Sequence, residues 1–78
     1  MSHSAPDKLV YMANQIGKFF KSQGEAKTVA GVSEHIKKFW DPRMRSQIYA
    51  HIDSGGAGLE PQVKAAIEKL KNAETAAK

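Results

Sequence analysis

Histidine and serine are the side chains of this sequence whose types could support catalysis, but their spacing matches no catalytic motif. The three histidines stand at positions 3, 35 and 51, and none is paired with an acidic residue in a known ligand motif. A catalytic metal ordinarily needs three convergent protein ligands. The chain has no cysteine and no serine within a Gly-x-Ser-x-Gly elbow. We therefore predict polar packing roles for the histidines, and no catalytic residue, metal ligand or cofactor site in this chain.

A glycine-rich segment at residues 55–58 (Gly-Gly-Ala-Gly) has the composition of a phosphate-binding loop. It lacks the Gly-Lys-Ser/Thr ending of a P-loop, and it follows a predicted helix, whereas a dinucleotide fingerprint follows a strand. Glycine after a helix usually adopts the left-handed conformation that ends the helix. The segment therefore predicts a turn and not a nucleotide site.

Residues 39–45 (Phe-Trp-Asp-Pro-Arg-Met-Arg) have the composition of a recognition surface. They contain the single tryptophan and both arginines of the chain. Tryptophan, arginine and methionine are enriched in protein interfaces. In an alternative interpretation, Phe39, Trp40 and Met44 belong to the core. Arg45 then pairs with Asp41, four residues earlier. The two interpretations are compatible, and we predict that this corner contacts another protein.

Amphipathic helices must position these residues. The first predicted helix begins near Ser4 as cap and ends at residues 22–24 (Ser-Gln-Gly), and the second runs from about Glu25 or Thr28 to Trp40. Their apolar arcs comprise Leu9, Met12, Ala13, Ile16, Phe19 and Phe20 in the first helix and Val29, Val32, Ile36, Phe39 and Trp40 in the second. Tyr11 lies opposite the first arc, so we expect it to be exposed. Gly17 costs about 1 kcal/mol relative to alanine inside a helix, which indicates a close approach of another helix.

Two further helices follow the Asp41-Pro42 dipeptide. Asp41 is the predicted N-cap and Pro42 the first residue of the third helix. Residues 59–61 (Leu-Glu-Pro) open the fourth helix. The inward residues are Met44, Ile48 and Ile52 in the third helix and Val63, Ala66, Ile67 and Leu70 in the fourth.

The length of 78 residues limits the chain to one small domain. We predict an all-α fold, a small compact bundle of about four helices over residues 7–71, with a flexible N-terminus at 1–6 and a frayed tail at 72–78. Burial of apolar surface contributes on the order of 115 kcal/mol, whereas ordering the chain costs roughly 117 kcal/mol. Because these two terms nearly cancel, burial against a partner would add to the stability of the fold.

The formal net charge of +4 favours an anionic partner. One alternative function is therefore a small basic helical nucleic-acid-binding module with the Asp41-Pro42 corner as a helix-turn-helix. The third helix offers Gln47, Tyr49 and two arginines without a basic stripe, which argues against nucleic acid as a partner. The sequence shows no apolar run of about 20 residues and no secretory signal, so we expect a cytoplasmic protein without a membrane partner.

Three blocks of the sequence resemble one protein family. They are residues 8–16 with Phe19-Phe20, residues 35–45, and residues 55–59 followed by Pro61 and Val63. Together these blocks resemble the delta subunit of the soluble NAD-dependent, molybdenum-containing formate dehydrogenase of bacteria. The resemblance covers about Lys8 to Leu70, and residues 39–45 are its most specific part.

The resemblance implies a non-catalytic accessory subunit of a molybdoenzyme, an oxidoreductase complex. Formate oxidation, molybdopterin guanine dinucleotide, iron–sulfur clusters and FMN then belong to the larger subunits. This chain would dock on those subunits, foremost the catalytic molybdenum subunit, and would stabilise the complex or assist its assembly. The residues expected to bind the partner are Tyr11, Asn14, Gln15, His35, Phe39, Trp40, Asp41, Pro42, Arg43, Met44 and Arg45.

Overall fold

The computed structural model describes residues 5–76 and confirms the predicted all-α fold. No strand occurs within these residues. The four α-helices are α1 (Ala5–Phe20), α2 (Glu25–Phe39), α3 (Pro42–Asp53) and α4 (Pro61–Ala76), and a short 3-10 helix, η1 (Lys21–Gln23), follows α1. Ser4, the predicted first cap, lies outside the described residues. Ala5 and Pro6 lie in α1, and residues 72–76 of the expected tail lie in α4.

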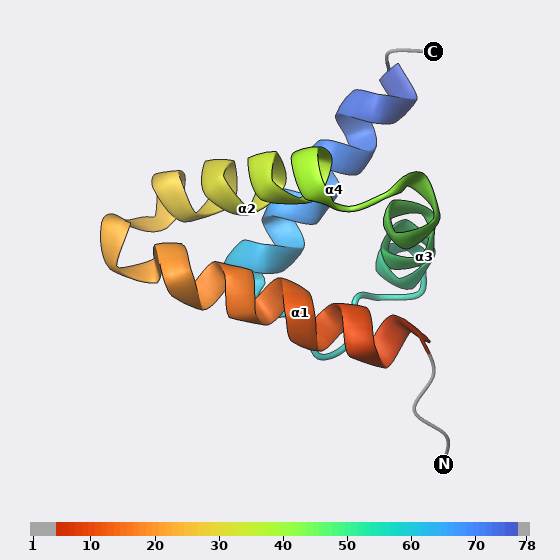
Figure 1. Cartoon of the computed structure of the whole chain (residues 1–78), viewed down its shortest axis with the longest axis horizontal. Helices are drawn as coiled ribbons and strands as arrows, with labels where there is room; N and C mark the ends of the chain where they lie inside the picture. Colours follow the sequence, from red (N-terminus) through yellow and green to blue (C-terminus); the bar gives the residue numbers. More distant parts are fainter. Residues whose placement is uncertain (1–4, 77–78) are drawn as a thin grey trace.

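Helices α1 and α2 form an antiparallel hairpin, and α4 crosses one face of it (Figure 1). Helix α3 stands at the end of the hairpin where α2 finishes (Figure 1). The opposite face of the hairpin is not covered by another helix of the described chain (Figure 1). Over residues 5–76, the helices are too short or too polar to cross a lipid bilayer.

The core lies between the hairpin, α3 and α4, and most of the predicted apolar arcs are confirmed there. The buried apolar residues are Leu9, Ala13, Val32, Ile36, Trp40, Ile48, Val63, Ala66, Ile67 and Leu70. Two expectations are wrong. The side chain of Phe19 is 74% exposed and that of Phe39 is 70% exposed. Both stand at the edge of an apolar arc.

Gly17 confirms the predicted close helix approach. A Cβ atom added to Gly17 would overlap Cγ2 of Val63 on α4. The absence of a side chain therefore allows α1 to pack directly against α4. Gly31 has the same role between α1 and α2, because a Cβ there would lie 2.7 Å from the ring of Phe20.

The connections between helices also follow the sequence. Asp41 caps α3, since its Oδ1 accepts a hydrogen bond of 2.9 Å from the amide of Met44. Gly55, Gly56 and Gly58 all have positive φ, at 117°, 67° and 86°. Only glycine adopts such angles readily, so the glycine-rich segment is a turn, as predicted.

Candidate functional site

A hollow lined by aromatic side chains lies on the uncovered face of the α1–α2 hairpin. We call it the aromatic groove; it is lined by Gln15, Ile16, Phe19, Phe20 and His35 and has a volume of about 350 Å³. The rings of Phe19 and Phe20 meet edge to face, with their centroids 5.1 Å apart. The ring of Phe39 lies beside the groove, 4.7 Å from the imidazole of His35. Exposed apolar surface of this kind is typical of a protein interaction site.

Tyr11 extends the surface along α1. It is 65% exposed, which confirms that it points away from the core. Gln15 Nε2 donates a hydrogen bond of 3.3 Å to the hydroxyl oxygen of Tyr11. This bond connects Tyr11 to the edge of the aromatic groove. The structure therefore brings together four predicted partner-binding residues, which are Tyr11, Gln15, His35 and Phe39.

Asn14 faces another part of the molecule. Its Nδ2 donates to the carbonyl of Gly58 at 2.9 Å, and its Oδ1 accepts from the amide of Glu60 at 3.0 Å. Both polar atoms of the side chain thus bind the segment between α3 and α4. Asn14 ties α1 to the start of α4.

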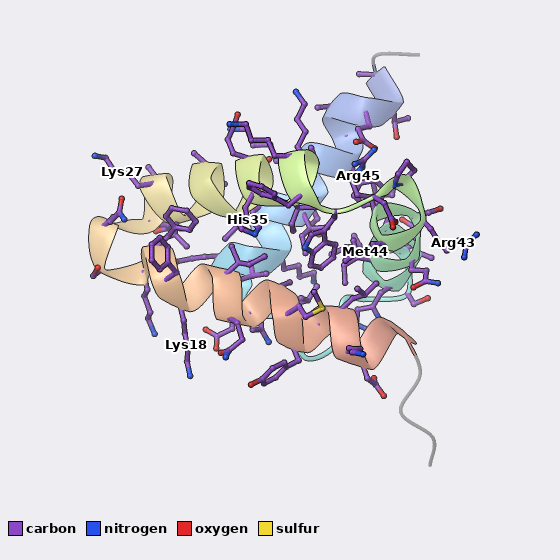
Figure 2. The ribbon with its side chains drawn as sticks, viewed as in Figure 1. Lys18, Lys27, His35, Arg43, Met44 and Arg45 are labelled. Carbon is purple, nitrogen blue, oxygen red and sulfur yellow. The ribbon has the colours of Figure 1, made fainter. Side chains whose placement is uncertain are left out.

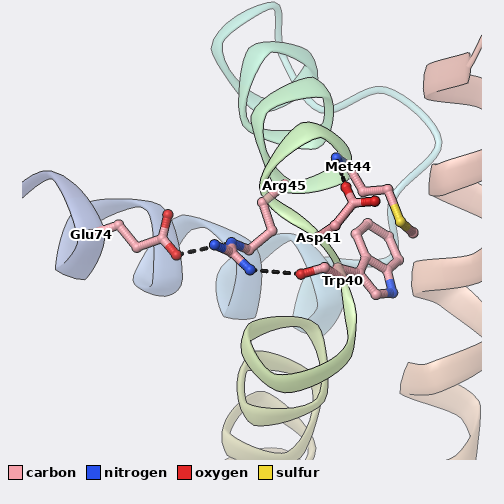
Figure 3. Close-up of polar contacts among 5 residues, drawn as sticks. All are labelled: Trp40, Asp41, Met44, Arg45 and Glu74. Atoms are coloured by element: carbon pink, nitrogen blue, oxygen red, sulfur yellow. Dashed lines mark hydrogen bonds and ion pairs between the residues drawn. The ribbon is translucent and has the colours of Figure 1, made fainter.

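The corner between α2 and α3 is held by contacts within the chain (Figure 3). The side chain of Trp40 is buried in the core. Arg45 Nη1 donates a hydrogen bond of 2.6 Å to the carbonyl of Trp40, and Arg45 Nε lies 3.1 Å from Oε2 of Glu74 (Figure 3). The expected pair between Arg45 and Asp41 is wrong. Asp41 binds the amide of Met44 instead, and Arg45 turns toward α4 (Figure 3).

The remaining corner residues differ in exposure. Pro42 is exposed at the first position of α3, and Met44 is half-buried against the core. Arg43 is exposed and projects outward at the α3 end of the molecule, away from His35 (Figure 2). The structure therefore separates Arg43 from the aromatic groove. The periodicity of the sequence did not predict that Ile16, Phe19 and Phe20 line a surface groove: Phe19 is exposed, whereas Ile16 and Phe20 pack against the core, as predicted, and are only partly buried.

Arg45 should stabilise the fold more than Arg43. We expect Arg45→Ala to lower the free energy of unfolding by about 1.5 kcal/mol, because a charge-assisted hydrogen bond is lost and Glu74 loses its partner. Arg43→Ala is the matched control and should change it by less than about 0.5 kcal/mol. Urea unfolding followed by circular dichroism measures both values. If Arg45→Ala and Arg43→Ala lower the free energy of unfolding by the same small amount, the contacts of Arg45 contribute nothing to stability.

Tyr49, in the same region, makes the stability of the fold depend on pH. Burial, together with the nearby carboxylate of Glu74, raises the pKa of Tyr49 above its ordinary value. The unfolded chain therefore releases this proton from about pH 10, while the folded chain retains it. The stabilisation is complete below about pH 10 and decreases as the pH rises further.

We expect Tyr49→Phe to lose stability less steeply than the wild type between about pH 10 and about pH 11, because phenylalanine has no proton to release. Urea unfolding of both proteins across this range, each normalised to its value at neutral pH, measures the difference. Identical slopes would contradict the assigned role of Tyr49.

The histidines show packing contacts. The imidazole of His35 contacts the ring of Phe39 at a tilt of 43°, and His51 Nε2 lies 2.7 Å from the carbonyl oxygen of Ala57, within hydrogen-bond distance. His3 lies outside the described residues. Among residues 5–76, no group of three histidine, aspartate or glutamate side chains converges as a metal site would require.

Comparison with known proteins gives one match. The model of a family described as NADH-dependent formate dehydrogenase delta subunit FdsD matches residues 8–67 of the 78-residue chain. No curated protein and no solved structure matches the chain. The matched range contains the whole of the aromatic groove and the corner at residues 39–45.

Proposed function

The chain belongs to the family of formate dehydrogenase delta subunits, and from this premise we propose that it is a non-catalytic accessory subunit. It docks on the larger subunits of an NAD-dependent formate dehydrogenase, foremost the catalytic molybdenum subunit. Docking stabilises the complex or assists its assembly. The observation that carries this proposal is the family match over residues 8–67.

Exposed aromatic surface supports docking as the mode of action. Phe19, Phe39 and Tyr11 are each at least 65% exposed, and Phe19 lines the aromatic groove with Phe39 beside it. Exclusion of water from exposed aromatic side chains lowers the free energy, so burial of this surface against a partner favours docking. Binding to the folded state also stabilises a small domain by mass action.

The proposed partner-binding residues divide into two groups. Some are accessible enough to touch a partner directly: Tyr11, Gln15, His35, Phe39, Asp41, Pro42 and Arg43. The others act by holding these in place through contacts within the chain: Asn14, Trp40, Met44 and Arg45. Arg43→Ala tests the corner separately from the aromatic groove.

The redox cofactors belong to the larger subunits in this proposal. Iron–sulfur clusters are held by cysteine thiolates, and this chain has no cysteine. The chain contributes binding surface, whereas molybdopterin guanine dinucleotide and FMN reside in its partners. Metal analysis and an absorption spectrum of the purified chain test this assignment, since stoichiometric molybdenum or iron, or a flavin band, would contradict it.

Co-expression tests the docking itself. We expect the tagged full chain to retain the larger subunits in a constant ratio through affinity and size-exclusion chromatography. Omission of the chain should reduce the yield of assembled, formate-oxidising complex. The proposal is overturned if the larger subunits never co-purify with the chain and assemble to full activity without it.

A further inference from the structure

The aromatic groove is an apolar channel between two antiparallel helices. Its walls are Gln15, Ile16, Phe19 and Phe20 from α1 and His35 from α2. Phe39 continues the α2 wall one helical turn beyond His35. Such a channel fits the helix-in-groove mode, in which an amphipathic helix lays its apolar face between two helices.

Lysines flank this channel on both helices. We call Lys8, Lys27 and Lys38 the lysine rim; all three are exposed. Lys8 stands seven residues, or about two helical turns, before the groove residue Gln15 on α1, so the two side chains lie on one face of the helix. Figure 2 shows Lys27 projecting outward from α2, whereas Lys18 projects from the other side of the hairpin and lines a different hollow with Glu60 and Val63.

The lysine rim is not neutralised within the described part of the chain. The ion pairs of residues 5–76 are formed by Arg45 with Glu74 and by Lys71 with Asp53. Glu34 is the one exposed acid that lies on α2 between Lys27 and Lys38. The rim therefore keeps a positive charge, and a negatively charged partner complements it.

The charge of the lysine rim and its extent along α2 indicate which kind of partner binds in the aromatic groove. A second copy of this chain would bring two lysine rims together, which like-charge repulsion disfavours. Lys27 and Lys38 stand eleven residues apart on α2, which corresponds to about 16 Å of helix, or about three turns. A partner helix of about three turns that lies along α2 over the aromatic groove therefore reaches both lysines.

We infer that the aromatic groove is the docking site for an amphipathic helix of a larger subunit, with apolar residues on one face and aspartate or glutamate on both flanks. This inference rests on the proposed function. It identifies the surface that binds and the chemistry of the segment that is bound. Phe19 and Phe39 are its apolar anchors, and the lysine rim sets its charge preference.

The test uses the full chain and the intact larger subunits. Phe19→Glu and Phe39→Glu should each weaken binding by about 30-fold or more, because central aromatic residues dominate interface affinity. Ala65→Glu is the matched control, since it adds the same charge at an exposed position of α4, on the other side of the hairpin. Phe19→Ala and Phe39→Ala should weaken binding by a factor of similar magnitude. Circular dichroism verifies that every variant is folded.

A separate experiment tests whether the aromatic groove prefers a negatively charged helix. Lys27→Glu combined with Lys38→Glu should weaken binding and remove most of its dependence on salt, whereas Lys69→Glu on α4 should not. A photo-crosslinker placed at position 39 should capture an acidic amphipathic helix of a larger subunit. Unchanged binding after reversal of the rim charges, or capture of a basic or extended segment, would overturn the acidic-helix assignment.

The outcomes separate the two proposals. If the wild-type chain does not bind the larger subunits, the proposed function fails. If the wild type binds and the Phe19 and Phe39 variants bind equally well, the groove is wrong while the function stands. Formation of a stable homodimer through the groove, or binding of its aromatic residues to anionic lipid vesicles, would also overturn the inferred occupant.

Discussion

Replacing Trp40 by alanine is expected to unfold the isolated chain. The indole is buried in the core at the junction of α2 and α3, with only 4% of the residue exposed. Removal of such a large buried side chain typically costs about 3–5 kcal/mol. A domain of this size rarely has more than about 3–5 kcal/mol of stability in total. The expected loss is therefore equal to most or all of the free energy of unfolding of the domain.

Trp40→Phe is the matched control, because it keeps an aromatic ring in the same space and should leave a cooperative unfolding transition. Far-UV circular dichroism and urea unfolding compare the two variants with the wild type. We also expect excess larger subunits to restore part of the assembly of Trp40→Ala, since binding draws the chain toward its folded state. If Trp40→Ala melts like the wild type but fails to assemble, Trp40 acts in the interface and not in the core.

Much of the fold follows from the periodicity of the sequence. Val63, Ala66, Ile67 and Leu70 recur at helical spacing, and all four are buried. The Asp41-Pro42 dipeptide both ends α2 and caps α3, because each of its effects depends only on neighbouring residues. Local rules of this kind predict element boundaries well wherever the signal is strong.

The same periodicity failed for Phe19 and Phe39 because it identifies apolar residues without showing what covers them. The apolar arc of α1 runs from Leu9 and Ala13, which are buried, to Phe19, which is exposed. The residues at one edge of the arc remain exposed in the isolated chain. In a subunit, an arc that exceeds the needs of its own core is consistent with a partner that covers the remainder.

Contacts between distant residues explain the other differences. Arg45 pairs with Glu74, which lies on α4, and no local spacing indicates this contact. The aromatic groove likewise requires the packing of α1 beside α2, which brings Phe19 and His35 to one surface. The sequence predicted the exposure of Tyr11 because that residue lies opposite its apolar arc.

The contact between α1 and α4 is expected to fail when Gly17 is replaced by leucine. Even the first carbon of a side chain at Gly17 would overlap Cγ2 of Val63, which is itself buried. We expect Gly17→Leu to cost about 3 kcal/mol, at the upper end of the usual range for overpacking. Ala30→Leu is the control, since it adds a leucine at an exposed position of α2. Urea unfolding of both variants measures the difference.

A second substitution distinguishes overpacking from other effects of the leucine. Val63→Ala alone should destabilise the fold, because it leaves a cavity beneath Gly17. Combined with Gly17→Ala, it should cost less than the sum of the two single substitutions, by about 0.5–3 kcal/mol, because each relieves the misfit that the other creates. Strict additivity would show that Gly17 and Val63 do not share one space. The close approach of α1 to α4 would then have another cause. The contact between Gly17 and Val63 would not be what determines which face of the hairpin α4 leaves uncovered.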